Sequence, residues 1–337
     1  MNVKNLKFPN GTTVGECTKK IRRSVKYPVL VFLLCLLVAF VRFIPLRAAE
    51  YFFAFWAALA FALIRKERQR TITSLSSVYE KEKTPEEIFR MARKVFINQG
   101  LNMANYLYSI KWTTRRQFAR IVDFVGEEHL SDAYAKGRGV ICLMMHVGSW
   151  ELSAIMPPVM GYSTTAVSKA LRHPKINRMI VAAREARGMK NIARGNSYQK
   201  LLDALAQGEC LIIMIDQDTR VKGVFVDFFG QKAYTPVGAA RLALDTLAPV
   251  LPMYVMRGGK KRYQFTILPE IPLVNTGNTE HDLLENTKNY TQSIENIIRE
   301  IPTQWVWMHE RWKTTPEDVE RYLKKKHGMS VIPLRQH

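Results

Sequence analysis

The residues best suited to chemistry are a histidine and a glutamate, His146 and Glu151, which follow a short apolar run at residues 140–145. Six consecutive apolar residues entered from a glycine-rich segment predict a strand that is buried on both faces. On one continuous helix the five-residue spacing would separate the two side chains by about 140°, so they do not form a helix-face pair. Gly148 permits a turn between this strand and a following helix, through which Glu151 can fold back onto His146. A carboxylate on one imidazole nitrogen would fix the tautomer and make the other nitrogen a general base, although a purely structural pair has the same pattern.

Other charged residues also follow predicted strands. Asp216 and Asp218 come after an apolar run at residues 210–215, and Lys169 and Arg172 come after a strand predicted at residues 164–167. In open sheets of parallel strands, binding sites form beyond the carboxyl ends of the strands. The two aspartates are therefore predicted either to orient a substrate or to pair with the basic residues. Arg172 fits a solvent-exposed basic face equally well.

The elements that must position these residues alternate along the chain. Strands are predicted at residues 121–125, 140–145, 164–167, 210–215, 250–255 and 263–268. Helices are predicted at residues 84–99, 127–135, 174–187, 197–208 and 281–299, with a further helix beginning at Pro236. Thr84, Pro85 and Glu87 have the spacing of a capping box at the start of the first of these helices. The alternation predicts an α/β fold with a mostly parallel sheet flanked by helices.

The N-terminal region contains two apolar runs, at residues 29–41 and 51–64. Each is shorter than the ~20 residues that a bilayer-spanning helix needs. Basic residues flank the pair on both sides, which favours a helical hairpin with both ends on one side of the membrane over a single span. We therefore expect a membrane-anchoring segment in residues 1–70 and a catalytic domain in residues 71–337. Deleting residues 1–64 should then loosen membrane attachment without unfolding the domain.

Composition limits the classes of partner. The 337 residues are 47% hydrophobic and carry a formal net charge of +21, which implies an anionic partner. Nucleic acid is not expected, because no recognition motif is present. The four cysteines, Cys17, Cys35, Cys142 and Cys210, lack the spacing of a disulfide framework or a metal site. They indicate a reducing compartment, and no metal or cofactor is expected.

Several segments together carry a resemblance to a known family. They are residues 137–140, 146–152, 223–230, 235–236 and 304–313, the last reading Gln-Trp-Val-Trp-Met-His-Glu-Arg-Trp-Lys. In this order they resemble the lipid A secondary acyltransferases, the lauroyl and myristoyl transferases of lipopolysaccharide assembly, within a superfamily like the glycerolipid acyltransferases. The resemblance extends from residue 28 to residue 317. The phenylalanine-rich segment, residues 223–230, and the tryptophan-rich segment, residues 304–313, are much more specific to this family than the histidine motif at residues 146–152.

The resemblance implies transfer of a fatty acyl chain from an acyl carrier protein thioester to a hydroxyl of a lipid A precursor. His146 would be the general base and Glu151 its partner. The family has a basic residue, usually arginine, at the position of Lys169, and another at Arg194; both would hold acceptor phosphates. Lysine keeps the charge but gives up bidentate geometry. Coenzyme A is an alternative donor carrier, a phosphatidylinositol mannoside is an alternative acceptor, and a non-catalytic protein that binds anionic lipids is an alternative class of function.

The substrates also suggest where the protein works. A carrier thioester made in the cytosol and a lipid acceptor meet at the cytoplasmic face of a bacterial inner membrane, where membrane lipids would also contact the protein. Ser149 lies close to His146 in the sequence, but no Gly-x-Ser-x-Gly segment is present, which disfavours a serine nucleophile. The tryptophans Trp305, Trp307 and Trp312 are expected either in the core or at the bilayer interface.

Overall fold

The computed structural model describes residues 28–327, apart from residues 29, 30, 34, 42, 111, 169, 171, 172, 196 and 220. The strands of the main sheet are β1 (Val122–Val125), β2 (Val140–Met144), β3 (Thr164–Ser168), β4 (Met189–Ala193), β5 (Cys210–Met214), β8 (Val250–Arg257) and β9 (Tyr263–Ile267). They form one sheet in the order β1-β9-β8-β2-β5-β3-β4. Strands β8, β2, β5, β3 and β4 are parallel, whereas β9 is antiparallel to β8 and parallel to β1.

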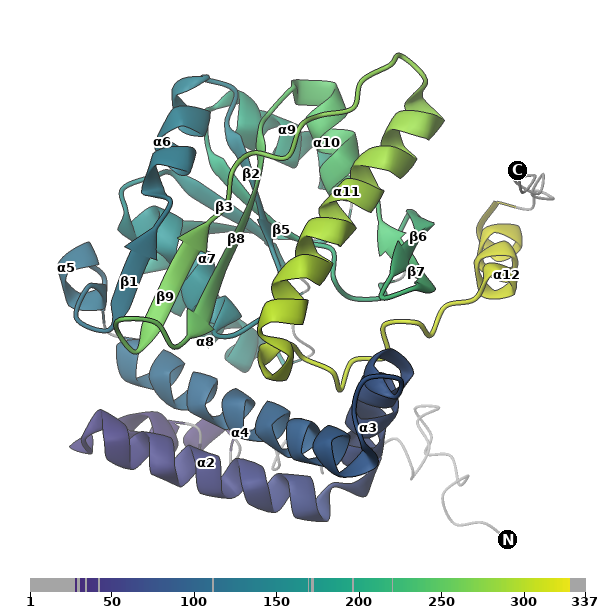
Figure 1. The fold of residues 1–337 in the computed structure, drawn as a ribbon. Helices are drawn as coiled ribbons and strands as arrows, with labels where there is room; N and C mark the ends of the chain where they lie inside the picture. Colours follow the sequence, from purple (N-terminus) through teal and green to yellow (C-terminus); the bar gives the residue numbers. More distant parts are fainter. Residues whose placement is uncertain are drawn as a thin grey trace, which may run out of the picture.

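Helices cover both faces of this sheet (Figure 1). They are α2 (Leu46–Leu63), α3 (Arg65–Tyr79), α4 (Pro85–Ser109), α5 (Arg115–Phe118), α6 (Glu127–Ala135), α7 (Trp150–Val159), α8 (Pro174–Glu185), α9 (Tyr198–Ala206), α10 (Gly238–Thr246), α11 (Thr279–Glu300), the 3₁₀ turn η2 (Pro302–Gln304) and α12 (Pro316–His327). The predicted α/β fold, a mostly parallel sheet flanked by helices, is confirmed. The predicted strands and helices are all present, with differences at their ends, and β4 is a strand that the sequence did not predict.

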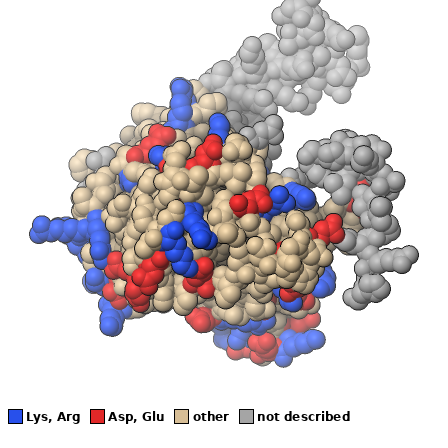
Figure 2. All heavy atoms as spheres, turned by 90° about the horizontal axis from the view of Figure 1, so that it is seen from above, with Lys and Arg blue, Asp and Glu red and all other residues tan. Residues whose placement is uncertain are grey.

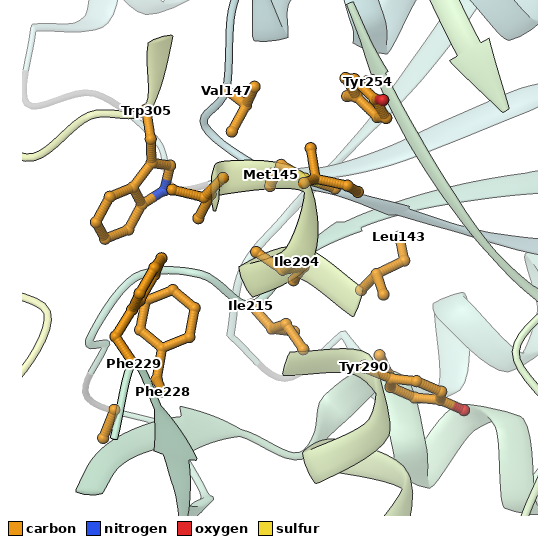
Figure 3. Packing of buried hydrophobic residues seen from close by; sticks show 14 of the residues in the cluster. Leu143, Met145, Val147, Ile215, Phe228, Phe229, Tyr254, Tyr290, Ile294 and Trp305 are labelled. Atoms are coloured by element: carbon orange, nitrogen blue, oxygen red, sulfur yellow. The ribbon is translucent and has the colours of Figure 1, made fainter. Parts of the chain in front are cut away.

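Strand β2 lies at the centre and is buried along its whole length. Ile141 and Leu143 belong to the core on the face that α9, α10 and α11 cover. Val140 and Cys142 belong to a second core, on the face that α6 and α7 cover. Figure 3 shows Leu143 close to residues of α11 in the first of these cores. An apolar residue is therefore required at every position, which explains the continuous apolar run.

A separate hairpin lies beside the sheet and was not predicted as strands. It consists of β6 (Gly223–Phe228) and β7 (Gln231–Pro236), paired antiparallel with Phe228 opposite Gln231. Both residues of the two-residue loop have positive φ, 56° at Phe229 and 73° at Gly230, as a type I′ turn requires. A phenylalanine is unusual there, and two contacts hold it: its N–H donates to Glu295 Oε2 at 2.6 Å, and its ring packs on Trp307. The hairpin explains the phenylalanine-rich segment and delays the start of the predicted helix from Pro236 to Gly238.

The base of the molecule is built from α2, α3 and α4. The predicted capping box starts α4: Glu87 N–H donates to the Thr84 hydroxyl at 3.3 Å, and Thr84 N–H donates to the Glu87 carboxylate at 2.8 Å. Helices α2 and α4 lie side by side (Figure 1). They are so close that a Cβ on Gly100 would lie 2.5 Å from the carbonyl oxygen of Phe53.

The division expected between residues 70 and 71 falls inside α3. In addition, Phe61 of α2 is buried in the main core of the domain. The N-terminal helices therefore pack as part of the domain in this structure, and they do not form a detached segment.

Helix α2 is, among the described residues, the one helix long and apolar enough to cross a membrane, and 17% of that stretch is buried within the protein. The described residues of the preceding apolar run, 31–33 and 35–41, are also helical. These two segments expose large apolar side chains, among them Phe32, Leu36, Phe40, Tyr51, Phe55 and Trp56. The face seen from above in Figure 2 has acidic and basic side chains interspersed. The described residues on that face therefore form no continuous patch of a single charge.

Candidate functional site

His146 lies just beyond the carboxyl end of β2, at the start of a tight loop. Gly148 in this loop has a φ of 52°, and a Cβ there would lie 2.0 Å from the carbonyl oxygen of Val255. Two backbone hydrogen bonds hold the loop, from Gly148 N–H to Gln304 O at 2.9 Å and from Ser149 N–H to Val255 O at 3.0 Å. Only glycine fits both the conformation and the close approach. The loop is thereby fixed between β8 and η2, and this fixes the backbone that carries His146.

The hydrogen-bond partner of the imidazole is Asp216. His146 Nδ1 lies 2.8 Å from Asp216 Oδ1, and the backbone N–H of His146 donates to Asp216 Oδ2 at 2.7 Å. Trp305 Nε1 donates to the same Oδ2 at 2.9 Å. The carboxylate is 1% exposed, so three donors converge on a buried negative charge. With the Nδ1 hydrogen directed at the carboxylate, Nε2 of the neutral ring carries a lone pair and can accept a proton.

The pKa values of this pair are shifted in opposite directions. Burial acts to raise the pKa of Asp216, but the charge of His146 and the hydrogen bonds from His146 and Trp305 outweigh it and lower this pKa to about 2. Burial acts to lower the pKa of His146, but the charge and hydrogen bond of Asp216, with a further contribution from the charge of Glu151, raise this pKa above its ordinary value. Asp216 is therefore ionised at any working pH, and His146 is a stronger base than a free imidazole.

Glu151 was expected to be the hydrogen-bond partner of His146. This prediction is wrong, because the structure pairs His146 with Asp216. The carboxylate of Glu151 pairs with Arg184 of α8 instead, at 2.7 Å from Nη2 and 3.3 Å from Nε. The reason is local, because α7 begins at Trp150 and its first turn points Glu151 toward α8 rather than back to the strand end. Glu151 remains close enough for its charge to raise the pKa of His146. Its orienting role belongs to Asp216, which the sequence had assigned to the substrate or to basic residues.

His146 and Glu151 both line a cavity of about 600 Å³ at the carboxyl ends of β2, β3 and β5. One part of its wall is apolar and includes Leu201, Ile212, Ile213, Val237 and Leu242. The solvent-facing part of the cavity is basic, because Arg194 and Lys222 line the cavity, both are exposed, and neither forms an ion pair within the described part of the chain. Arg194 is thus brought to the same cavity as His146. The arrangement can hold an apolar chain beside a general base, with anionic groups at the entrance.

The remaining predicted site residues lie elsewhere or are not described. Asp218 accepts hydrogen bonds from Thr314 N–H at 2.7 Å and from the Thr314 hydroxyl at 2.8 Å, so it ties the loop after β5 to the C-terminal segment. Lys169 and Arg172 fall outside the described residues. Ser149, the alternative nucleophile, is 2% exposed. Within the described part of the chain, no three residues from histidine, cysteine, aspartate and glutamate are placed to bind a metal ion.

The tryptophan-rich segment contributes to the site in a way that the sequence left open. Trp305 and Trp307 are 1% and 0% exposed, so they belong to the core and do not lie at a bilayer interface. Trp305 orients Asp216, and Arg311 donates to Tyr234 O at 2.7 Å, which links the segment to the β6–β7 hairpin. The sequence signal for such a role was the concentration of indole and guanidinium donors in residues 304–313, but their acceptor could not be identified, because Asp216 is 89 residues from Trp305 in the chain.

Comparisons with known proteins show the family of this chain. Residues 16–314 match the family described as bacterial lipid A biosynthesis acyltransferase. A lipid A biosynthesis acyltransferase of Haemophilus influenzae is 24% identical over 266 residues, which cover 77% of this chain and 79% of that protein. The lipid A biosynthesis lauroyltransferase of Escherichia coli is 28% identical over 251 residues, 71% of this chain and 76% of that protein. A phosphatidylinositol mannoside acyltransferase of Mycobacterium tuberculosis is 24% identical over 212 residues, 61% of this chain and 65% of that protein.

The family match covers most of the chain and includes the loop with His146, the strand end with Asp216 and the whole tryptophan-rich segment. The names of the relatives agree on acyl transfer to a glycolipid and differ in the acceptor. This chain therefore belongs to the family of bacterial lipid A biosynthesis acyltransferases.

Proposed function

We propose that the protein transfers a fatty acyl chain from an acyl carrier protein thioester to a hydroxyl of a lipid A precursor. The observation that carries the proposal is the His146–Asp216 pair, whose histidine lines a cavity with an apolar wall and a basic opening. Coenzyme A is the alternative carrier. A phosphatidylinositol mannoside is the alternative acceptor, because relatives with that name match this chain.

In the proposed step His146 Nε2 removes the proton from the acceptor hydroxyl as its oxygen attacks the thioester carbonyl. An ester bond forms and the carbon–sulfur bond breaks, and the imidazolium returns its proton to the departing carrier thiol. Asp216 stabilises the imidazolium through the 2.8 Å contact at Nδ1 and maintains the tautomer. Glu151 adds a second negative charge near the ring, since it too raises the pKa of His146.

The two parts of the cavity suggest how the substrates are divided. The acyl chain would lie against Leu201, Ile212 and Leu242, where burial of each methylene contributes about 0.8 kcal/mol. Phosphates of the acceptor or the carrier would meet Arg194 and Lys222 at the opening. Lys169 keeps its proposed role as a further phosphate-binding residue, and Arg172 stays a predicted substrate-binding residue for which an exposed basic face is the alternative.

The position of the exposed apolar side chains suggests how the protein meets a membrane. They lie on α2 and the helical residues before it, at the base beside α4. A basic groove of about 1050 Å³ lies next to this base, between α4 and the β8–β9 turn, and Lys94, Arg120 and Lys260 line it. Apolar side chains in the bilayer and basic side chains at anionic headgroups would place the domain on the cytoplasmic face of a bacterial inner membrane.

The test is mass spectrometry of total lipid A from cells with the gene, without it, and without it but complemented by a His146→Ala variant. We expect the deletion to remove one acyl group, and the variant to be present in the membrane without restoring that group. Restoration by the variant would support a non-catalytic lipid-binding role. Unchanged lipid A, together with loss of an acyl group from another glycolipid, would identify the alternative acceptor.

The phosphate assignment has a separate test. Arg194→Ala should raise the KM for a phosphorylated acceptor roughly tenfold, because one charge-assisted hydrogen bond contributes about 1.5–3 kcal/mol in favourable cases. Arg116→Ala is the matched control, since Arg116 is exposed on α5 and does not line the cavity. An equal KM in both variants would contradict the assignment.

A further inference from the structure

Helix α4 presents a polar face to the loop that carries His146. Gln99, Asn102 and Tyr106 have the spacing that puts residues on one side of a helix. Together with Ser149, Trp150 and Glu151 they line a second cavity, of about 120 Å³. Trp150 and Glu151 also line the larger cavity that contains His146, so the same two residues border both cavities.

Each of the three polar side chains on α4 has a buried atom without a partner. Gln99 Nε2, Asn102 Oδ1 and Tyr106 Oη make no hydrogen bond within the described part of the chain. The orientation of Asn102 is fixed, because its Nδ2 donates to Gly148 O at 2.6 Å and leaves Oδ1 as the unpaired atom. Buried polar atoms without partners destabilise a fold, and native proteins contain few of them. Three such atoms around one cavity indicate a polar guest.

The chemistry of the lining identifies the class of guest. The cavity offers an amide donor, an amide acceptor and a phenol that can do both, which matches hydroxyl groups. No lysine or arginine lines it, and the carboxylate of Glu151 does, so a phosphate is disfavoured. The volume equals that of about four waters, at roughly 30 Å³ each, which is enough for one edge of a sugar ring.

The position of the cavity fits entry from the membrane side. Met103 also lines it and is 48% exposed on α4, the helix against which the apolar α2 packs. An unbranched methionine side chain can move aside easily. A lipid with its chains at the base of the protein would therefore have its headgroup beside this cavity.

We propose that this cavity, the α4 pocket, binds sugar hydroxyls of the acceptor glycolipid and thereby positions the reacting hydroxyl toward His146. The inference rests on the proposed function, because it assumes that the acceptor is a glycolipid. Gln99 and Tyr106 are then positioning residues. Asn102 also holds the loop at Gly148, so its substitution would test two roles at once.

The test compares Tyr106→Phe and Gln99→Met with Tyr290→Phe. Tyr290 is the matched control, because its hydroxyl is also buried and unpaired, but it belongs to α11 in the main core and lines neither cavity. Without ligand, both Tyr→Phe variants should unfold at the wild-type temperature or above it. Only Tyr106→Phe and Gln99→Met should lower kcat/KM for a lipid A precursor, by about tenfold, with the KM for the acyl donor unchanged.

A binding measurement separates this inference from the proposed mechanism. Lipid A precursor is added in phosphocholine micelles, which carry no sugar, to His146→Ala protein with and without Tyr106→Phe. We expect the single variant to bind the precursor without turnover, and the double variant to bind about tenfold more weakly. Equal binding by both, or kinetics of Tyr106→Phe that equal those of Tyr290→Phe, would show that the pocket holds only water and would overturn the inference. Turnover by His146→Ala would instead overturn the proposed function.

Discussion

The sharpest test of the site is Asp216→Asn, which keeps the shape of the side chain and removes its charge. In the wild type, Asp216 Oδ2 accepts from both His146 N–H and Trp305 Nε1, whereas Oδ1 faces His146 Nδ1 alone. The single oxygen of asparagine should therefore take the Oδ2 place, where two donors require an acceptor. Its NH₂ group then faces Nδ1, which must accept a hydrogen bond. The imidazole hydrogen moves to Nε2, and the nitrogen that lines the cavity loses its lone pair.

The size of the effect follows from this geometry. Returning to the competent tautomer would put two donors face to face, and each unsatisfied buried group costs about 1–3 kcal/mol. The imidazolium also loses a charged partner, which contributes about 1.5–3 kcal/mol. The low ends of these ranges sum to about 3.5 kcal/mol, which corresponds to a loss in kcat of at least about 300-fold.

The assay is steady-state kcat with purified protein, an acyl carrier thioester and a lipid A precursor, accompanied by a thermal unfolding curve. Asp218→Asn is the matched control, since it makes the same chemical change two residues away, where the carboxylate bonds Thr314. We expect the control to retain more than a tenth of wild-type kcat. A folded Asp216→Asn protein with kcat within tenfold of wild type would refute the assignment of His146–Asp216 as the base and its partner.

Three further predictions follow from the site and from the base of the protein. Activity should fall as the pH drops through the raised pKa of His146, because the protonated imidazole cannot act as a base. Glu151→Gln should move this fall to lower pH, because it removes a negative charge that raises the pKa of His146. A pH profile of kcat/KM checks the direction of the shift. Gly148→Ala should cost more than about 100-fold in activity by displacing the loop, whereas Gly161→Ala, also at positive φ but with no atom within 4 Å of the added Cβ, should not. Glu50→Gln should lower the free energy of unfolding in detergent by about 1–3 kcal/mol, because it leaves Arg257 and Arg262 without a charged partner. Glu67→Gln, at a half-exposed pair with Arg70, should change it by less than about 0.5 kcal/mol.

The contacts of Glu50 also change the expectation for a truncated protein. Residues 1–64 include Glu50, which forms ion pairs with Arg257 and Arg262. They also include Phe61, which packs in the main core. Deleting this segment should therefore destabilise the domain as well as loosen its attachment to a membrane. A truncated protein with an unchanged unfolding temperature would contradict this packing argument.

Much of the fold could be predicted from local pattern. The apolar run that became β2 has an apolar residue at each position because both faces of the strand are buried, and this requirement leaves a clear signal in the sequence. The helix Glu127–Ala135 and the capping box at Thr84 were also predictable, because short-range hydrogen bonds and side-chain periodicity determine them. By contrast, the loop of the β6–β7 hairpin depends on Phe229 at positive φ, which long-range contacts with α11 and Trp307 hold in place.

Of the site, the sequence by itself indicated His146 as the candidate general base and its position beyond the end of a buried strand. Only the tertiary structure decided which carboxylate bonds it. Met144 and Met214 are opposite each other in the pairing of β2 with β5, so the residues two positions further on, His146 and Asp216, leave the sheet side by side. Strand order and register are set by the packing of the whole sheet, and a sequence separation of 70 residues gives no local signal of them. Glu151 is only five residues away, but the first turn of α7 directs it to Arg184, so nearness in the chain did not become contact.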